Sequence, residues 1–296
     1  PPGLAGGPIS PRKSQNYSIA IALGLIIPFG LFVLLELFND KVQSREDIEK
    51  ITDIPFIGGI GHKKVESNLI VSQNPKSAVA ESFRALRSNL NYFTGHQDKK
   101  VFLVTSSLSG EGKTFTSVNL ATVLALSGKK TILIGADMRR PRIFEDFQLN
   151  NESGLSTYLS EMSDLKSVIQ PTSIENLYLL AGGPVPPNPS ELLLKERIGN
   201  MFEELKESFD YIILDTPPVA LVTDAFVLSK YADHTLFVIR QDYTPKNVLR
   251  TIHDYYRDGR IKNLSLVLND IFRSGPGYGY GYGGYGYSYG YGYNYN

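Results

Sequence analysis

The sequence predicts a doubly wound α/β domain, in which helices cover both faces of a mostly parallel sheet. Short apolar strands alternate with helical stretches through the middle of the chain, which is typical of that fold class. A long uncharged run before this domain predicts a membrane-spanning helix, and the residues after it are almost only glycine and tyrosine. The expected segments are a Pro/Gly-rich linker (1–16), a transmembrane helix (17–38), a juxtamembrane linker (39–76), the α/β domain (77–274) and a disordered tyrosine-rich tail (275–296).

The composition narrows the functions that the chain can have. Its 296 residues include 30 basic and 30 acidic side chains, so the formal net charge is zero and no nucleic-acid partner is expected. The absence of cysteine excludes disulfides, thiolate metal sites and a cysteine nucleophile. The chain begins at Pro1 rather than at methionine, so we expect it to be a fragment of a longer protein.

The run from Tyr17 to Leu35 contains no charged residue and is rich in Ile, Leu and Phe. At about 1.5 Å per helical residue, it can cross a hydrocarbon core of about 30 Å. A buried helix of a soluble domain is the alternative, but the polar Pro-rich segment before the run and the charged segment after it favour a membrane span. Pro28 lies inside the run, and membrane helices tolerate a proline kink.

The α/β domain is expected to begin with a helix at residues 78–93. Further helices are expected at 113–127, ended by Gly128, and at 191–208, with Ser190 as the N-cap. Several candidate strands are short and continuously apolar, as expected for a sheet that is covered on both faces. The candidate strands are 101–105, 131–134, 177–180, 211–214, 235–239 and 264–268.

The first chemical motif joins strand 101–105 to the next helix, and residues 107–114 read Ser-Leu-Ser-Gly-Glu-Gly-Lys-Thr. Glycines in such a loop let backbone N–H groups approach phosphate oxygens, the lysine reaches the β- and γ-phosphates, and the threonine hydroxyl binds Mg²⁺. The common pattern begins with glycine, which is Ser107 here, but the strand–loop–helix context supports a P-loop. A glycine turn with a surface lysine would leave two acidic motifs unexplained. The expected nucleotide-binding residues are Ser109, Gly110, Glu111, Gly112, Lys113, Thr114 and Phe115.

These two acidic motifs follow apolar strands, at the edge where open α/β sheets bind ligands. Asp137 follows the second candidate strand and can hold Mg²⁺ or accept a proton from an attacking hydroxyl, although an acid that caps a turn would look the same. Asp215 follows the fourth candidate strand and fits a second acid that orients Mg²⁺ or its water. The arginines that can hold phosphate beside the first acid are Arg139, Arg140 and Arg142.

Together these motifs resemble the bacterial tyrosine kinases, and most closely the membrane-bound polysaccharide co-polymerase type. The resemblance covers roughly residues 17–296 and includes the span, a Glu-x-x-Arg-x-x-Arg helix, the three motifs, the segment 187–193 and the tyrosine-rich C-terminus. It implies an ATP-dependent, autophosphorylating protein-tyrosine kinase that regulates exopolysaccharide or capsule assembly and export through phosphorylation-dependent oligomerisation. It also implies a bacterial cytoplasmic (inner) membrane location with residues 39–296 in the cytoplasm, where ATP is found.

The resemblance implies roles for individual residues, with ATP and Mg²⁺ as cofactors. Lys113, Asp137 and Asp215 would be catalytic. Thr114 would join the two acids as a metal ligand, and Asn269 would contact adenine.

The Glu-x-x-Arg-x-x-Arg helix has two interpretations. Glu81, Arg84 and Arg87 recur every three residues, so they share one helix stripe. From the residues alone, an intrahelical pair on a solvated face is the simpler interpretation. The resemblance instead implies that these residues join neighbouring subunits into a ring.

The tyrosine tail would supply the phosphoryl acceptors, each offered to the active site of a neighbouring copy. The implied partners are other copies of the chain, membrane lipid, a cognate protein-tyrosine phosphatase, and polysaccharide polymerisation and export proteins. The expected autophosphorylation sites are Tyr278, Tyr280, Tyr282, Tyr285, Tyr287, Tyr289, Tyr291, Tyr293 and Tyr295.

The sequence departs from the family in two places. The family's second motif commonly has two acids, but the first is Gly135 here, which leaves the identity of the general base open. Ser109 stands where many members have proline.

Two other functions compete with the kinase. One is a partition or septum-placement ATPase, which is disfavoured because Leu108 replaces that class's extra lysine. The other is a non-catalytic membrane scaffold with a degenerate site.

Overall fold

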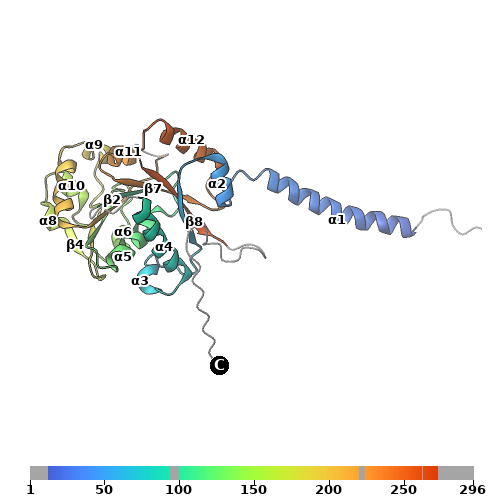
Figure 1. Ribbon diagram of the computed structural model, residues 1–296, viewed down its shortest axis with the longest axis horizontal. Helices are drawn as coiled ribbons and strands as arrows, with labels where there is room; N and C mark the ends of the chain where they lie inside the picture. Colours follow the sequence, from blue (N-terminus) through green and yellow to red (C-terminus); the bar gives the residue numbers. More distant parts are fainter. Residues whose placement is uncertain (1–12, 94–99, 220–223, 262, 273–296) are drawn as a thin grey trace, which may run out of the picture. The chain divides into compact units, whose positions relative to one another are not determined.

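A computed structural model of the chain describes residues 13–93, 100–219, 224–261 and 263–272 (Figure 1). The chain divides into two compact units, Pro1–Lys41 and Val42–Asn296. In the first unit, the helix α1 spans Lys13–Leu37 and contains Pro28. Its window Ser14–Phe32 is long and apolar enough to cross a membrane, and none of that window is buried.

The second unit is built on an eight-stranded sheet with the order β1-β8-β7-β2-β6-β3-β5-β4. Each neighbouring pair is parallel except β4 and β5, which are antiparallel. This topology confirms the predicted doubly wound α/β fold. The strands are β1 Phe56–Gly61, β2 Lys100–Ser106, β3 Thr131–Gly135, β4 Ile169–Pro171, β5 Leu177–Leu180, β6 Tyr211–Asp215, β7 His234–Arg240 and β8 Leu264–Ile271.

Helices cover both faces of the sheet. The helices α3, α4 and α5 pack on one face, and α10, α11 and α12 pack on the other, where α12 also contacts α2. The helices of this unit are α2 Arg45–Ile51, α3 Ile70–Gln73, α4 Ala78–Phe93, α5 Lys113–Ala125, α6 Ile143–Asp146, α7 Leu155–Leu159, α8 Leu165–Val168, α9 Pro189–Leu192, α10 Arg197–Ser208, α11 Asp224–Ser229 and α12 Lys246–Arg257.

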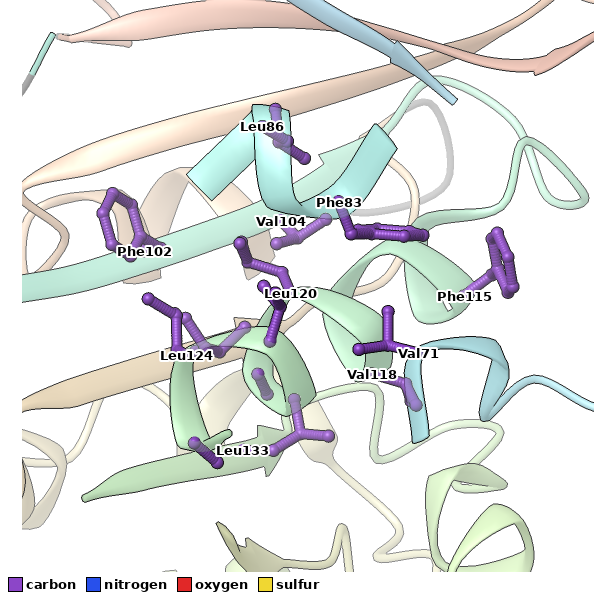
Figure 2. Close-up of a cluster of buried hydrophobic side chains, with 14 of the residues drawn as sticks. Val71, Phe83, Leu86, Phe102, Val104, Phe115, Val118, Leu120, Leu124 and Leu133 are labelled. Carbon is purple, nitrogen blue, oxygen red and sulfur yellow. The ribbon is translucent and has the colours of Figure 1, made fainter. Parts of the chain in front are cut away.

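Alternating side chains of each strand supply the two cores. In β2, Phe102 and Val104 face α4 and α5 (Figure 2), whereas Val101 and Leu103 belong to the cluster on the opposite face. All seven residues of β2 are buried, because a central parallel strand has a helix layer on each side. Burial of each large apolar side chain contributes about 1.5–3 kcal/mol, so the core fixes β2 and the loop that follows it.

The structure differs from the predicted elements in two segments. Residues 39–76, expected as a linker, include α2, α3 and the edge strand β1, which pairs with β8 in the main sheet. The glycine-rich sequence of β1, Phe-Ile-Gly-Gly-Ile-Gly, lacks the continuous apolar run of the other strands. The helix expected at 191–208 is divided into α9 and α10, and Ser190 lies inside α9, where its hydroxyl donates to Asp224 rather than capping a helix.

Candidate active site

The candidate site lies where the carboxyl ends of β2, β3, β6, β7 and β8 meet at one edge of the sheet. The loop between β2 and α5 carries the phosphate-binding motif, and Gly112 is the N-cap of α5. Gly110 and Gly112 have φ values of 88° and 94°, in the left-handed region that favours glycine. The sheet thus holds the loop at the edge where open α/β sheets bind ligands.

Both loop glycines also make room for a neighbouring side chain. A Cβ atom at Gly112 would lie 2.0 Å from Asn269 Nδ2, and one at Gly110 would lie 3.3 Å from Tyr243 Oη. The loop motif predicted for these glycines only a role in letting phosphate approach. The structure adds a packing role, since Tyr243 in the segment after β7 and Asn269 in β8 lie against the loop at these positions.

Lys113 and Thr114, in the first turn of α5, reach the two predicted acids. The Lys113 ammonium lies 3.4 Å from Asp137 Oδ2, and both side chains are mostly buried. Thr114 Oγ1 donates to Asp215 Oδ2 at 2.7 Å, and Ser117 Oγ donates to Asp215 Oδ1 at 3.1 Å. The residues predicted from three separate motifs are therefore in direct contact.

The Asp215 carboxylate is buried, and its environment acts on it in opposite directions. Burial raises the pKa of Asp215 above its usual range, while the nearby Lys113 charge and the Thr114 hydrogen bond act to lower that pKa. A carboxylate in such a place is stabilised by a further positive charge. This charge requirement fits a cation held beside Thr114 and Asp215.

The donor set fits a nucleotide-bound Mg²⁺ rather than a metal held by protein alone. Among the residues that the structure describes, no group of three or more His, Asp or Glu side chains could hold a metal ion. Mg²⁺ typically takes one or two carboxylates and completes its shell with phosphate oxygens and water. Thr114, Asp137 and Asp215 match that chemistry, while Lys113 and the loop N–H groups match phosphate.

Glu111 is a fully buried acid within the loop, at 0% exposure. Its carboxylate accepts hydrogen bonds from the Ser107 hydroxyl (2.7 Å), the Leu108 N–H (2.7 Å) and the Thr244 hydroxyl. The side chain points into the protein, so only its backbone can face a phosphate. Glu111 thus fixes the shape of the loop and links it to the residues after β7.

The segment after β7 and the end of β8 hold the loop from the side opposite the acids. Arg240 Nη1 donates to the Gly110 carbonyl at 3.0 Å, and Tyr243 Oη donates to the Ser109 carbonyl at 2.9 Å. Asn269 Nδ2 donates to the Glu111 carbonyl at 2.9 Å, which places this predicted nucleotide contact against the loop. Arg240, Tyr243 and Thr244 belong to no sequence motif, so their contacts with the loop were not predicted.

The three arginines near Asp137 have different surroundings. Arg139 donates to Ser190 Oγ at 2.6 Å and lies 3.5 Å from the buried Asp224 carboxylate, so its charge is already paired. The backbone N–H of Arg140 donates to Asp137 Oδ1 at 3.2 Å, and its side chain is exposed. Arg142 immediately precedes α6. Arg139 therefore links the second motif to the 187–193 segment.

Gly135 ends β3 at a crowded position. A Cβ atom there would lie 2.9 Å from Ile143 Cγ2 and 3.3 Å from the Gly182 nitrogen. A side chain at this position would require the Ile143 side chain to shift and would crowd the Gly182 backbone. The close packing around Gly135 is consistent with glycine, rather than the family's usual acid, at this position. Asp137 is therefore the sole carboxylate of its motif.

Phe115 lies next to the phosphate-binding residues but belongs to the core. It is buried and packs edge-on against Phe83, with ring centroids 5.6 Å apart (Figure 2). Any contact of Phe115 with a nucleotide would have to use its backbone.

The Glu-x-x-Arg-x-x-Arg stripe lies on α4, away from the acids. Glu81 Oε2 and Arg84 Nη1 are 2.7 Å apart, with side chains 72% and 38% exposed. Arg84 also donates to the Pro75 carbonyl, and Arg87 donates to the Val123 carbonyl. The intrahelical pair exists within one chain, and an intersubunit role stays a prediction. The nine tail tyrosines lie outside the described residues.

The fold and this site define a P-loop nucleotide-binding protein. A family model described as an AAA domain matches residues 99–257. The chain is 37% identical over 207 residues to the putative tyrosine-protein kinase CapB of Staphylococcus aureus, covering 70% of this chain and 91% of that protein. The kinase domain of the Escherichia coli tyrosine kinase ETK matches with a TM-score of 0.72 and 29% identity, over 81% of this chain and 100% of that one. The chain belongs to the bacterial tyrosine-kinase family.

Longer relatives also match. The tyrosine-protein kinase wzc of Salmonella typhi is 33% identical over 92% of this chain, but the match spans only 40% of that protein. The tyrosine-protein kinase ptk of Acinetobacter johnsonii is 31% identical, with 39% of its length matched. The chain thus spans well under half the length of several curated relatives.

Proposed function

We propose that the chain is an ATP- and Mg²⁺-dependent protein-tyrosine kinase that is anchored in the bacterial cytoplasmic membrane by α1, with residues 39–296 in the cytoplasm. The convergence of Lys113, Thr114, Asp137 and Asp215 at one phosphate loop carries the proposal. That arrangement occurs in a chain whose relatives are named tyrosine-protein kinases.

Phosphoryl transfer depends mainly on positioning and on neutralisation of charge. When bound, ATP and Mg²⁺ supply the phosphoryl group and the cation that neutralises it. The loop N–H groups and Lys113 bind the phosphates, and Thr114 and Asp215 hold the metal. Asn269, whose amide already lies against the loop, is the proposed adenine contact.

Asp137 is the proposed proton acceptor. A tyrosine hydroxyl has a pKa of about 10, so a carboxylate that takes its proton aids the attack. Because Gly135 leaves no second acid in this motif, the alternative acceptor is Asp215. Asp215 is the poorer candidate, since both its oxygens accept hydrogen bonds from α5.

We also propose that the tail and the α4 stripe control a cycle in which the chains assemble into a ring and separate again. Tail tyrosines of one copy are phosphorylated by the next copy in a ring that Glu81, Arg84 and Arg87 hold together. Each phosphate adds about −1.5 to −2 charges, so heavily phosphorylated tails repel one another and loosen the ring. A cognate phosphatase would reverse this, and the cycle would regulate capsule or exopolysaccharide assembly and export.

The test is phosphotyrosine formation by the purified chain in detergent with ATP and Mg²⁺. Wild type is compared with Lys113→Met and with Lys129→Met, which removes an exposed lysine away from the site. Signal in wild type and Lys129→Met but not in Lys113→Met supports the kinase. ATP hydrolysis without phosphotyrosine would indicate the partition-type ATPase instead, and binding without either reaction would indicate a scaffold.

A further inference from the structure

Tyr243 lies beside the phosphate loop and is accessible to solvent. Its hydroxyl donates to the Ser109 carbonyl at 2.9 Å, and its ring lies 5.3 Å from the Arg240 guanidinium. The residue is nevertheless 40% exposed. Among the tyrosines that the structure describes between residues 42 and 272, only Tyr92 and Tyr243 are classed as exposed. Tyr243 therefore combines accessibility with direct contact to the loop.

The contact is on the outer side of the loop. In a trans peptide, the C=O of one residue and the N–H of the next point in opposite directions. The carbonyls of Ser109 and Gly110 point to Tyr243 and Arg240, so the N–H groups of Gly110 and Glu111 point away from them. Phosphate binds N–H groups, so the loop itself separates the Tyr243 hydroxyl from a nucleotide on its own chain.

We propose that Tyr243 is a phosphorylation site that a second copy of the chain modifies, and that its phosphorylation weakens nucleotide binding by the modified copy. The inference rests on the proposed kinase activity but concerns a tyrosine of the folded domain rather than of the tail. Phosphorylation of Tyr243 would thus inhibit the modified copy by acting on its phosphate loop.

The reaction transfers the γ-phosphoryl group of ATP bound to the second copy. The Tyr243 oxygen forms a bond to the γ-phosphorus, and the bond between that phosphorus and the bridging oxygen breaks, which releases ADP. The phenol proton passes to a carboxylate of the second copy. The products are phosphotyrosine and ADP, and no other reactant is needed.

Phosphorylation would remove the outer support of the loop. The phenol oxygen loses its only hydrogen, so it can no longer donate to the Ser109 carbonyl. The phosphate adds about −1.5 to −2 charges beside that carbonyl, which repels it. Arg240 donates to the Gly110 carbonyl, pairs with Asp270 at 2.6 Å and has its guanidinium carbon 5.3 Å from the centre of the Tyr243 ring. Its movement toward the phosphate would release the Gly110 carbonyl as well.

The first experiment maps the site. A full-length ¹⁵N-labelled Lys113→Met chain, unable to use ATP, is mixed in detergent with an unlabelled active copy whose nine tail tyrosines are changed to phenylalanine, and peptides of each copy are identified by mass spectrometry. Phosphate at Tyr243 of the Lys113→Met copy is the expected result. Phosphate on its tail but not at Tyr243 overturns this inference and leaves the kinase proposal standing. No phosphotyrosine anywhere contradicts both.

The second experiment measures the consequence. The tail-substituted active chain is phosphorylated, and its affinity for a fluorescent ATP analogue is measured before and after phosphatase treatment. Phosphorylation is expected to weaken binding about tenfold, because added negative charge and lost hydrogen bonds act on the same loop. The ratio should persist in Tyr92→Phe and disappear in Tyr243→Phe. An unchanged affinity in the parent chain, or a ratio that survives Tyr243→Phe, overturns the proposal.

Discussion

Two flanks of the phosphate loop are made from different kinds of residue. On the acidic flank, Asp137 and Asp215 at the ends of β3 and β6 lie against Lys113 and Thr114. On the support flank, defined by Arg240, Tyr243, Thr244 and Asn269, side chains hydrogen-bond the loop's carbonyls or the buried Glu111 carboxylate.

The difference separates chemistry from shape. On the acidic flank Asp137 presents charge to a ligand, so a change at Asp137 should affect the reaction with little effect on folding, whereas the buried Asp215 also accepts hydrogen bonds from α5. The side chains of the support flank make their hydrogen bonds to the loop itself, so changes there should affect stability and nucleotide affinity together. Variants of the two flanks can therefore be told apart by measuring both properties.

The largest effect is expected for Asp137→Asn on the acidic flank. The amide keeps the shape of the side chain but cannot take a proton, so the phosphorylation rate should fall by about 10²- to 10⁴-fold. The thermal midpoint should change little. Rates are measured with saturating ATP, and Asp258→Asn, an exposed acid far along the chain, is the control. A rate within threefold of wild type would transfer the proton-accepting role to Asp215.

Glu111→Gln should cause the next largest effect, on the link to the support flank. One of the two oxygens becomes an NH₂ group, so at least one of the donors Ser107, Leu108 and Thr244 loses its acceptor inside the protein. Leaving a buried donor unsatisfied costs about 1–3 kcal/mol, so the unfolding free energy should fall by about 2 kcal/mol. Urea unfolding measures this, and the exposed Glu152→Gln is the matched control. Equal stability of the two variants would contradict a structural role for Glu111.

The two flanks also differ in how much of them the sequence reveals. Asp137 and Asp215 each follow a continuously apolar strand, so a local pattern located them, and the parallel sheet brought them together. The support flank depends on hydrogen bonds between residues 130 to 158 positions apart, such as Arg240 with Gly110 and Asn269 with Glu111. No local pattern encodes such pairs, and only the family resemblance singled out Asn269.

The prediction of the strands has the same limit, because local patterns do not encode long-range pairing. The buried central strands were predicted because each is an apolar run, and the order of strands follows from packing that no single segment specifies. The edge strand β1 was missed because two adjacent glycines interrupt its apolar pattern, and its position depends on pairing with β8 about two hundred residues later. The short antiparallel strand β4 was missed for lack of length.

A change of pH should alter the stability of the fold through His234 in β7, the strand that leads into the support flank. His234, the first residue of β7, is 6% exposed and hydrogen-bonds Ser265 Oγ at 2.9 Å. Burial lowers the pKa of His234 from 6.5 to about 4. Protonation therefore favours the unfolded chain, so the stability is fully present above pH 6.5 and is lost as the pH falls from 6.5 toward 4. At pH 5 the loss should be about 2 kcal/mol.

Thermal unfolding at pH 7 and pH 5 measures this loss in wild type and in His234→Gln. The glutamine cannot take a proton, so the variant should lose about 2 kcal/mol less than wild type between the two pH values. The exposed surface acids contribute equally to both chains and cancel in the comparison. An identical pH dependence of the two chains would show that folding does not lower the pKa of His234, which contradicts the prediction.

The smallest effect on stability is expected at the α4 stripe, which belongs to neither flank. The Glu81–Arg84 pair is exposed, and such pairs contribute about 0–1 kcal/mol, so Glu81→Gln should change the unfolding free energy by about 0.5 kcal/mol or less. Arg84 keeps its hydrogen bond to the Pro75 carbonyl, which limits the loss further.

If the stripe joins subunits, Glu81→Gln should nevertheless reduce the size of the oligomer measured by light scattering in detergent, because Glu81 is then paired across an interface. Lys76→Gln, a charge change at an exposed position just before α4, controls for altered surface charge. A stable chain with a smaller oligomer identifies Glu81 as an interface residue, whereas an unchanged oligomer limits it to the intrahelical pair.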